Sequence, residues 1–396
     1  MVGNFFLITL FLIASSVAEV KYKEIHVFNG TDGGGPLGKL LLSTDNKLYG
    51  STAGGGEHGC GTLFTIDGDR HTLIHHFNCS HGQAPFAELV EVAPGTFYGT
   101  TQNGGLFNKG TLFKFNATHP LEVLHDFNGK DGSVPTYLVK VSDNKLYGVT
   151  VTGGDHNAGT IYTIDLNGGV QSIYHFHPLF NGAYPMGLVA FETEVYVLSQ
   201  LGPNTLGAIY EIDQNDTVTL LYEFNPNNPP TVGFPNGLTF VNTSTEPHLF
   251  GTGIYAYPPP NYSLQCCGLF SANSTVMHPP AKNSPPLIAL LKTISLSASL
   301  GGFTYDGDVF LYGVSPSSYE TAFEKGGIYR FKAEGKTERT LEPLFYFDSD
   351  PTIVGKYPKV PPTQQEPGVF YGVTYGTDNT VSPKPGDAGV VYKLIV

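Results

Sequence analysis

Residues 48–64 read LYGSTAGGGEHGCGTLF, and altered forms of this phrase return twice along the chain. They are FYGTTQNGGLFNKGTLF at residues 97–113 and LYGVTVTGGDHNAGTIY at residues 146–162. Each copy has a Tyr-Gly pair in an apolar run, then a glycine-rich gap, then a Gly-Thr pair that opens a second apolar run. Short β-branched and aromatic runs bounded by glycine predict two antiparallel strands joined by a loop.

Three separate anchors extend this repeat, at intervals of about fifty residues, to seven units. The Tyr-Gly position is held by Tyr49, Tyr98, Tyr147, Tyr196, Phe250, Tyr312 and Tyr371. The second apolar run carries an aromatic residue at Phe64, Phe113, Tyr162, Tyr210, Phe270, Tyr329 and Tyr392. A proline enters every unit except the sixth, at Pro36, Pro85, Pro135, Pro185, Pro235 and Pro358. The first unit predicts four strands, at about 38–44, 47–53, 61–67 and 71–78.

Four short antiparallel strands in each unit of a long tandem repeat are typical of β-propeller blades. The last residues, GVVYKLIV, match the third strand of a unit and stop there, whereas VKYKEIHVFNG at residues 20–30 matches the fourth strand. We therefore expect the N-terminal strand to complete the last blade and to cover its open edge. The predicted fold is all-β, a seven-bladed propeller of four-stranded antiparallel blades.

The N-terminus predicts export. Residues 1–18 contain an apolar run from Phe5 to Ile13 followed by the small residues Ser16-Val17-Ala18, as in a secretory signal peptide. Residues 19–396 then form one propeller domain, and no later stretch has the length and apolarity of a membrane span. Seven Asn-x-Ser/Thr sequons predict glycosylation at Asn29, Asn78, Asn116, Asn215, Asn242, Asn261 and Asn273. We expect a secreted, extracellular, monomeric glycoprotein.

Composition narrows the classes of partner. The net charge of −13 argues against a nucleic-acid binder, because phosphate contacts need a positive surface. The chain has no Trp, so any stacking on a sugar ring falls to its 23 Tyr and 27 Phe. We find no motif for a cofactor, a phosphate loop, a nucleophile elbow or a metal-ligand spacing.

The quoted phrases, each preceded by an HxFN…G…P segment, resemble the GloVer-type (Gloeo/Verruco) tandem repeat, a propeller-like repeat of secreted proteins. The resemblance covers the mature chain and is strongest in the first three units. It implies a fold and export rather than an activity, and it carries no catalytic residue over to this chain.

The long glycine-rich loops between the second and third strands should lie on one face, together with the connections between units. This face offers polar candidates for ligand contact: Asp32, Glu57, His58, Asn103, Asn108, Asp155 and His156. Three readings remain open: glycine-rich turns alone, a polar ring that binds a glycan or peptide, and a calcium site. His26, His75 and His125 recur at one repeat position, which indicates an architectural role.

The fifth unit departs most from the repeat, with insertions at about 254–266 and 274–286. Tyr255, Tyr257 and Tyr262 stand beside three prolines in the first insertion, either as surface decoration or as a rigid aromatic contact loop. Cys266 and Cys267 are adjacent and could form a vicinal disulfide, remain thiols or link two chains. Cys60 and Cys79 flank a predicted hairpin and should form a disulfide.

The sequence favours a non-enzymatic extracellular module that binds a glycan or protein on the loop face, and it leaves enzymatic activity open. The alternative is an extracellular polysaccharide hydrolase or lyase that uses Asp, Glu and His of the same loops. A structural coat or matrix protein is a third possibility.

Overall fold

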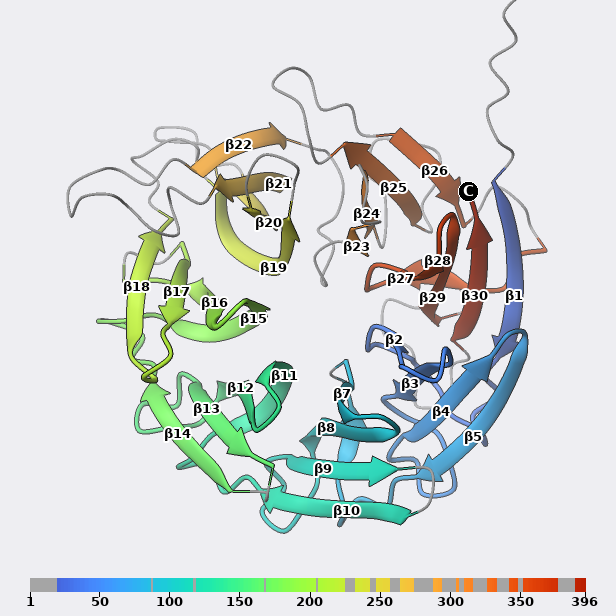
Figure 1. Cartoon of the computed structure of the whole chain (residues 1–396), viewed down its shortest axis with the longest axis horizontal. Helices are drawn as coiled ribbons and strands as arrows, with labels where there is room; N and C mark the ends of the chain where they lie inside the picture. Colours follow the sequence, from blue (N-terminus) through green and yellow to red (C-terminus); the bar gives the residue numbers. More distant parts are fainter. Residues whose placement is uncertain are drawn as a thin grey trace, which may run out of the picture.

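The computed structural model describes residues 20–86, 88–116, 119–166, 169–203, 206–224, 232–242, 247–256, 264–273, 288–293, 304–305, 310–315, 326–332, 342–347, 352–376 and 389–396. Their strands pair into seven antiparallel sheets placed around a central axis (Figure 1). Six sheets are made from consecutive strands, and one closing sheet joins the two ends of the chain. The predicted all-β propeller of four-stranded antiparallel blades is confirmed.

The first three sheets follow the three clearest repeats. The first sheet contains β2 (Leu41–Leu42), β3 (Leu48–Thr52), β4 (Thr62–Asp67) and β5 (Arg70–His76). The second contains β6 (Gln83–Pro85), β7 (Val90–Ala93), β8 (Thr96–Asn103), β9 (Thr111–Asn116) and β10 (His119–Asp126). The third contains β11 (Ser133–Ser142), β12 (Lys145–Thr152), β13 (Thr160–Asp165) and β14 (Val170–His175).

The remaining sheets continue around the ring. The fourth contains β15 (Ala183–Phe191), β16 (Glu194–Leu201), β17 (Ala208–Ile212) and β18 (Val218–Glu223). The fifth contains β19 (Val232–Asn242), β20 (Pro247–Ala256), β21 (Leu264–Asn273) and β22 (Ile288–Thr293). The sixth contains β23 (Thr304–Tyr305), β24 (Phe310–Ser315), β25 (Gly327–Lys332) and β26 (Glu342–Tyr346).

The closing sheet contains β27 (Lys356–Pro358), β28 (Thr363–Glu366), β29 (Val369–Gly376), β30 (Val390–Ile395) and β1 (Lys21–Val27). Strand β1 runs antiparallel to β30, with Lys21 opposite Ile395 and Val27 opposite Val390. The predicted pairing of the two chain ends is therefore confirmed. It gives the backbone groups of β30 a partner on the edge that the end of the chain would otherwise leave open.

In the first unit, the second, third and fourth strands lie within two residues of their predicted bounds. The first strand, predicted at 38–44, forms a ladder only over β2. Pro36 has no N–H to give to a ladder, and the segment that it begins contacts the closing sheet at Gly389. The sequence pattern predicted the apolar segment correctly but could not show that only Leu41 and Leu42 join the ladder.

The Tyr-Gly anchor fits the packing between sheets. Tyr49 of the first sheet packs against Phe97 of the second, with ring centroids 4.3 Å apart. The glycine that follows makes room for an aromatic ring, because a Cβ on Gly50 would lie 2.5 Å from Cζ of Phe64. Gly50 and Phe64 both lie in the first sheet. Large aromatic residues therefore pack between the first and second sheets.

A second contact joins five pairs of neighbouring sheets. Gly61, Gly110, Gly159, Gly207 and Gly389 open the third strand of their units with positive φ or a tight backbone approach, and a Cβ on each would collide with a proline ring of the following sheet. The prolines are Pro85, Pro135, Pro185, Pro235 and Pro36. The last pair joins the closing sheet to the first sheet, so the same contact continues across the seam of the ring. We call this contact the Gly–Pro joint.

The predicted disulfide between Cys60 and Cys79 is present, with the two Cα atoms 5.5 Å apart. Cys266 and Cys267 lie in β21, but their side chains are outside the described residues, as are Tyr257 and Tyr262. Tyr255 lies in β20, opposite Val232 of β19, and its side chain is likewise not described. Within the described ranges, no helix is both long and apolar enough to cross a membrane.

We predict that Gly110→Ala destabilises the fold through the Gly–Pro joint. Gly110 has φ +98° and a Cβ there would meet the backbone of Thr101 and the ring of Pro135. The free energy of unfolding should fall by about 1–3 kcal/mol more than in Gly95→Ala, because overpacking adds to the backbone strain. Gly95 has φ +72° but open space around a Cβ, so it controls for strain alone. Urea unfolding followed by tyrosine fluorescence measures both variants, and equal losses would argue against the joint.

Candidate functional site

The loops of one face form a continuous belt of backbone hydrogen bonds. The β3–β4 loop lies between two connecting loops and is hydrogen-bonded to both. Gly56 N donates to Gly30 O, and Ala84 N donates to Cys60 O. The second and third sheets repeat both bonds, through Gly105 to Cys79, Val134 to Lys109, Gly154 to Gly129 and Tyr184 to Ala158. The two kinds of loop therefore lie on the same face, as the sequence predicted, and each braces its neighbour.

Paired threonines hold the base of this belt. Thr52 and Thr62 share a hydrogen bond of 2.8 Å between their hydroxyls, and Thr62 Oγ1 also donates to the carbonyl of Asp32. The other two clear repeats do the same, with Thr101 and Thr111 and with Thr150 and Thr160 each 2.9 Å apart. These buried hydroxyls satisfy one another and fix the height of the loops above the sheets.

Several predicted ligand-face residues are used by the belt itself. Asn108 Oδ1 accepts a hydrogen bond from Gly104 N at 3.0 Å, and Asn157 Oδ1 accepts one from Gly153 N at 3.0 Å. Asn108 and Asn157 both have positive φ, the conformation that asparagine tolerates in tight turns. Asn103 ends β8, where its carbonyl accepts the hydroxyl of Thr101. For these positions the geometry supports the turn reading.

Histidines at the end of the outer strands also serve the loops. His76 Nδ1 accepts from Glu57 N at 3.1 Å, and His175 Nδ1 accepts from Asp155 N at 3.0 Å. Asp126 has this position in the second sheet and accepts from Leu106 N. His26 and His125 each contact an aspartate of the connecting loop, Asp32 and Asp131, at 2.8 Å. Contacts repeated in this way are what an architectural role predicts.

The loop tips remain free to meet a ligand. The exposed tip dipeptides occupy one repeat position: Glu57-His58, Leu106-Phe107 and Asp155-His156. The polar character of Glu57-His58 and Asp155-His156 predicts them as ligand-face residues from the sequence. The apolar Leu106 and Phe107 escape this prediction, although both side chains are exposed at the same repeat position.

The tip that contains His156 packs against an exposed aromatic surface of the β14–β15 loop. The ring of His156 lies 4.1 Å from that of His177, and the ring of Phe180 lies 4.4 Å from that of His177, measured between centroids. Leu179 and Phe180 are each 74% exposed. We call Asp155, His156, His177, Leu179 and Phe180 the His156–Phe180 patch. Its last three members lie in the β14–β15 loop, which has one residue more than the corresponding loops, and that insertion was the signal in the sequence.

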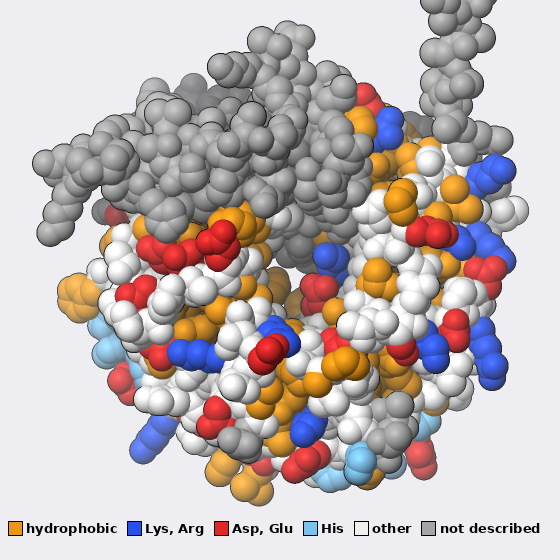
Figure 2. Space-filling model, in the orientation of Figure 1, with side chains coloured by type: hydrophobic (Ala, Val, Ile, Leu, Met, Phe, Trp, Pro, Cys, Tyr) orange, Lys and Arg blue, Asp and Glu red, His pale blue; other side chains and the backbone are white. Residues whose placement is uncertain are grey.

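The ring encloses a second candidate site on its axis. Figure 2 shows a hollow at the centre of the ring, where basic and acidic side chains are visible. A cavity of about 600 Å³ lies along the inner strands, and an adjoining cavity of about 310 Å³ shares its lining residues Lys39, Glu88 and Tyr137. Lys359 and Tyr375 line the smaller cavity but not the larger one. We call these five residues the channel group.

Burial changes the acidity of the channel group. It raises the pKa of Glu88, against the opposing effect of the Lys39 charge. It lowers the pKa of Lys359 and raises that of Tyr137 to about 12. Lys39, Glu88 and Tyr137 each immediately precede a buried leucine, at Leu40, Leu89 and Leu138. This position is not among the residues predicted from the sequence, although its change from basic to acidic to aromatic is visible in the repeat.

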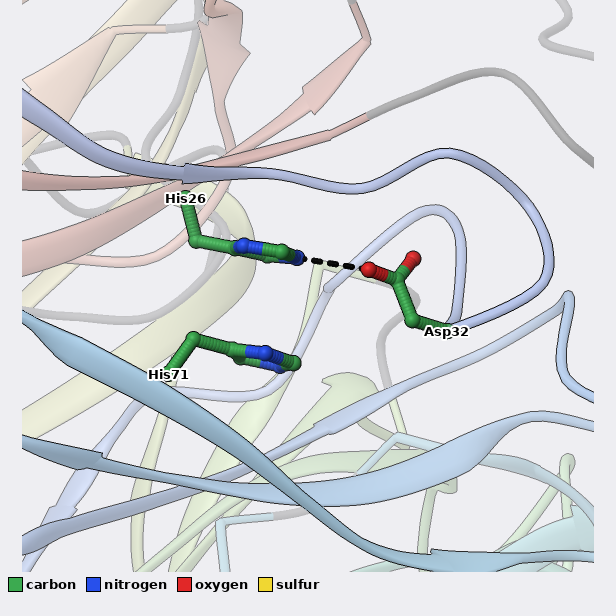
Figure 3. Close-up of side chains that lie close together, drawn as sticks. All are labelled: His26, Asp32 and His71. Carbon is green, nitrogen blue, oxygen red and sulfur yellow. Dashed lines mark hydrogen bonds and ion pairs between the residues drawn. The ribbon is translucent and has the colours of Figure 1, made fainter.

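A third group of titratable side chains lies beside the seam of the ring. His26 of β1, Asp32 of the loop that follows it and His71 of β5 each place one donor atom within 4.8 Å of the others (Figure 3). The rings of His26 and His71 stack with centroids 3.7 Å apart and an angle of 4° between planes. Burial, and then the neighbouring His26, lowers the pKa of His71 to about 4.

The predicted glycosylation sites are only partly described. Asn29 and Asn215 are exposed, and Asn78 and Asn116 are half-buried. Asn78 Oδ1 accepts hydrogen bonds from Ser80 Oγ and His81 N. Asn242 and Asn273 end strands β19 and β21 without a described side chain, and Asn261 lies outside the described residues. Glycosylation at all seven positions stays a prediction.

We predict that His75→Tyr, which installs the residue found at Tyr174 in the third sheet, weakens the acid sensitivity of the fold. Burial, followed by the charges of His81 and His76, lowers the pKa of His75 below its ordinary 6.5. The stabilising contribution of neutral His75 is therefore present above pH 6.5 and is lost as the pH falls below it, because the unfolded chain takes up the proton first.

The measurement is the free energy of unfolding in urea between pH 7.5 and pH 5. The slope with pH should be shallower in His75→Tyr than in the unchanged protein. His58→Tyr, on an exposed loop tip, controls for the loss of one histidine. Identical slopes in the unchanged protein and His75→Tyr would show that this histidine does not contribute.

Comparison with known proteins agrees with the fold. The solved structures include BP39L lectin from Burkholderia pseudomallei, which is similar with a TM-score of 0.57 and 6% sequence identity, over 94% of this chain and 95% of that one. At this identity the likeness shows the fold alone. A search of the curated proteins finds no match.

The family comparison bears on the repeat itself. The model of the Gloeobacter/Verrucomicrobia repeat matches residues 9–200, a range that contains the three clearest copies and the loops of the His156–Phe180 patch. The family recognised from the sequence is confirmed over these residues. Over residues 9–200, this chain is similar to the Gloeobacter/Verrucomicrobia repeat family.

Proposed function

We propose that this chain is a secreted, non-enzymatic binding module that recognises glycans through the loop face of a seven-bladed propeller. The count of seven takes the six consecutive sheets together with the closing sheet. Export is supported by the predicted signal at residues 1–18 and by the Cys60–Cys79 disulfide, since such bonds persist in oxidising compartments.

The observation that carries the proposal is the His156–Phe180 patch. Exposed aromatic rings offer flat apolar surface to the C–H face of a sugar, and a neighbouring carboxylate accepts hydrogen bonds from its hydroxyls. Asp155 supplies that carboxylate, with its side chain 70% exposed and 3.5 Å from His175 Nδ1. The loop bonds of Asp155 N and Tyr184 N hold both segments of the patch in place before a ligand arrives.

Two further points favour a glycan. The loop tips Glu57-His58 and Leu106-Phe107 stand at equivalent positions, so neighbouring sheets can add contacts to a branched or repeating ligand. A protein of the same fold, BP39L, is a lectin. The insertions of the fifth unit, with Tyr255, Tyr257 and Tyr262, remain the candidate surface for a protein ligand instead.

We predict saturable binding of the purified protein to members of a glycan array, with Phe180→Ala and Asp155→Ala each weakening the affinity about tenfold, because a central aromatic contact is worth about 1–2 kcal/mol. Phe107→Ala, at the corresponding tip of the second sheet, is the matched control and should change the affinity less. Calorimetry with the best glycan measures all three variants. A blank array would contradict glycan recognition, and unchanged affinity in Phe180→Ala and Asp155→Ala would contradict the patch.

The channel group supports a second candidate function, an extracellular hydrolase or lyase acting on an acidic polysaccharide. Burial raises the pKa of the Glu88 carboxyl group, which is the direction that a general acid requires. Lys39 and Lys359 in the same cavities would attract an anionic sugar. Asp32, which the sequence suggested, suits this chemistry less because it is paired with His26, as Asp131 is with His125.

This second function predicts that the protein cleaves uronate-containing polysaccharides and that Glu88→Gln abolishes the activity while keeping the fold. Release of reducing ends and absorbance of unsaturated products report hydrolysis and elimination separately. Phe180→Ala should retain activity, since the patch lies outside the channel. If no polysaccharide is cleaved, or if Glu88→Gln cleaves as well as the unchanged protein, the channel has no such role.

A further inference from the structure

The group of His26, Asp32 and His71 spans the seam where the chain closes its ring. His26 belongs to β1, which completes the closing sheet, whereas His71 belongs to β5 of the first sheet. Asp32 lies in the loop between these two sheets, where Asp32 Oδ1 accepts a hydrogen bond from Asn29 N. Three side chains from separate parts of the seam therefore point toward one place, as Figure 3 shows.

Comparison with the third sheet separates what is repeated from what is new. His125 and Asp131 form the same pair at the same 2.8 Å as His26 and Asp32. His71 pairs with Ile66 in the first sheet. The equivalent of Ile66 in the third sheet is Ile164, which pairs with Val170, so Val170 occupies the position of His71. The His–Asp pair is thus a property of the repeat, but the second imidazole occurs where the other copy has an apolar side chain.

His71 is not placed there by a hydrogen bond. Its Nε2 is buried and has no partner among the described residues. Burying an imidazole nitrogen without a partner is costly. The arrangement therefore has an unused donor atom beside a carboxylate and a second imidazole. Solvent can still reach the group, since the side chains of His26 and Asp32 are 22% and 19% exposed.

We propose that His26, Asp32 and His71 bind one divalent transition-metal ion, for which Zn²⁺ is the best fit, and that the ion fastens the N-terminal strand to the first sheet. Two imidazoles and a carboxylate are a donor set that Zn²⁺ accepts at about 2.0–2.2 Å, with water in the fourth position. Calcium and magnesium prefer oxygen donors throughout, so the two nitrogens exclude them.

Binding requires a small change in the two rings. Parallel stacked imidazoles direct their lone pairs side by side, whereas a tetrahedral ion needs them to converge on one point. The rings must therefore splay, by rotation about the side-chain bonds of His26 and His71, for the ion to bind. The ion would bind the folded chain only, since the unfolded chain does not bring residues 26 and 71 together, and so it should raise the stability of the closed ring.

The experiment is calorimetric titration of the purified, tag-free chain with zinc chloride after removal of metals by chelation, together with thermal unfolding with and without the ion. We expect one tight site per chain and a rise in Tm of at least about 2–4 °C at saturation. His71→Leu and Asp32→Asn should each weaken the tight site at least about tenfold and remove the rise in Tm.

Matched variants separate this site from the other histidines. His125→Leu disrupts the His–Asp pair that lacks a third donor, and His156→Ala disrupts the adjacent imidazoles of the patch; both should keep the tight site. Val170→His supplies the missing donor beside His125 and Asp131, and it should create a second site of the same kind. This added site tests the geometry even if His71→Leu or Asp32→Asn folds poorly.

Each result decides the matter. Zinc binding of equal affinity in His71→Leu, absence of a tight site in the unchanged protein, or no second site in Val170→His would each overturn the proposal. Loss of the site in His156→Ala alone would place the ion at the patch instead.

Discussion

The contact between a glycine of one sheet and a proline of the next sheet sets the geometry on which the rest of the ring depends. At Gly61 and Pro85, and again at Gly389 and Pro36, the chain approaches so closely that no other residue fits on the glycine side. Because the proline ring rests on backbone, neighbouring sheets meet at a fixed distance, and the aromatic wedge between them can be filled by one Tyr and one or two Phe. The loop belt above follows from the same approach, since it brings each pair of loops within hydrogen-bonding reach.

Repetition separates structural contacts from candidates for function. The threonine pairs, the loop bonds of His76 and His175 and the His–Asp pairs recur from sheet to sheet, as expected of groups that hold the ring together. The remaining features break the pattern. They are the extra residue before Phe180, the change from Lys39 to Glu88 to Tyr137 along the channel, and the second imidazole at His71. A ring of similar sheets thus offers three chemically different places, on its loop face, on its axis and at its seam.

These places differ in what they can bind. The His156–Phe180 patch is exposed, aromatic and acidic, which suits a neutral sugar held against a flat surface. The channel group combines two lysines with a carboxyl group of raised pKa, which suits an anionic ligand drawn into a narrow space. The seam group is small and rich in nitrogen donors, which suits an ion. A ligand at one of them need not compete with a ligand at another.

The sequence alone determined the repeat, the strands, the closure by the N-terminal segment and the Cys60–Cys79 bond, because each of these depends on local pattern or on residues close in the chain. It also selected Glu57, His58, Asp155 and His156 as exposed loop residues. It could not show that the Asn108 side chain is hydrogen-bonded within its own turn, or that Glu88 is buried on the ring axis. Nor could it show that the ring of His71 stacks on the ring of His26. Those outcomes depend on side chains from different sheets, whose distances are set only when the ring closes and the sheets take their fixed spacing.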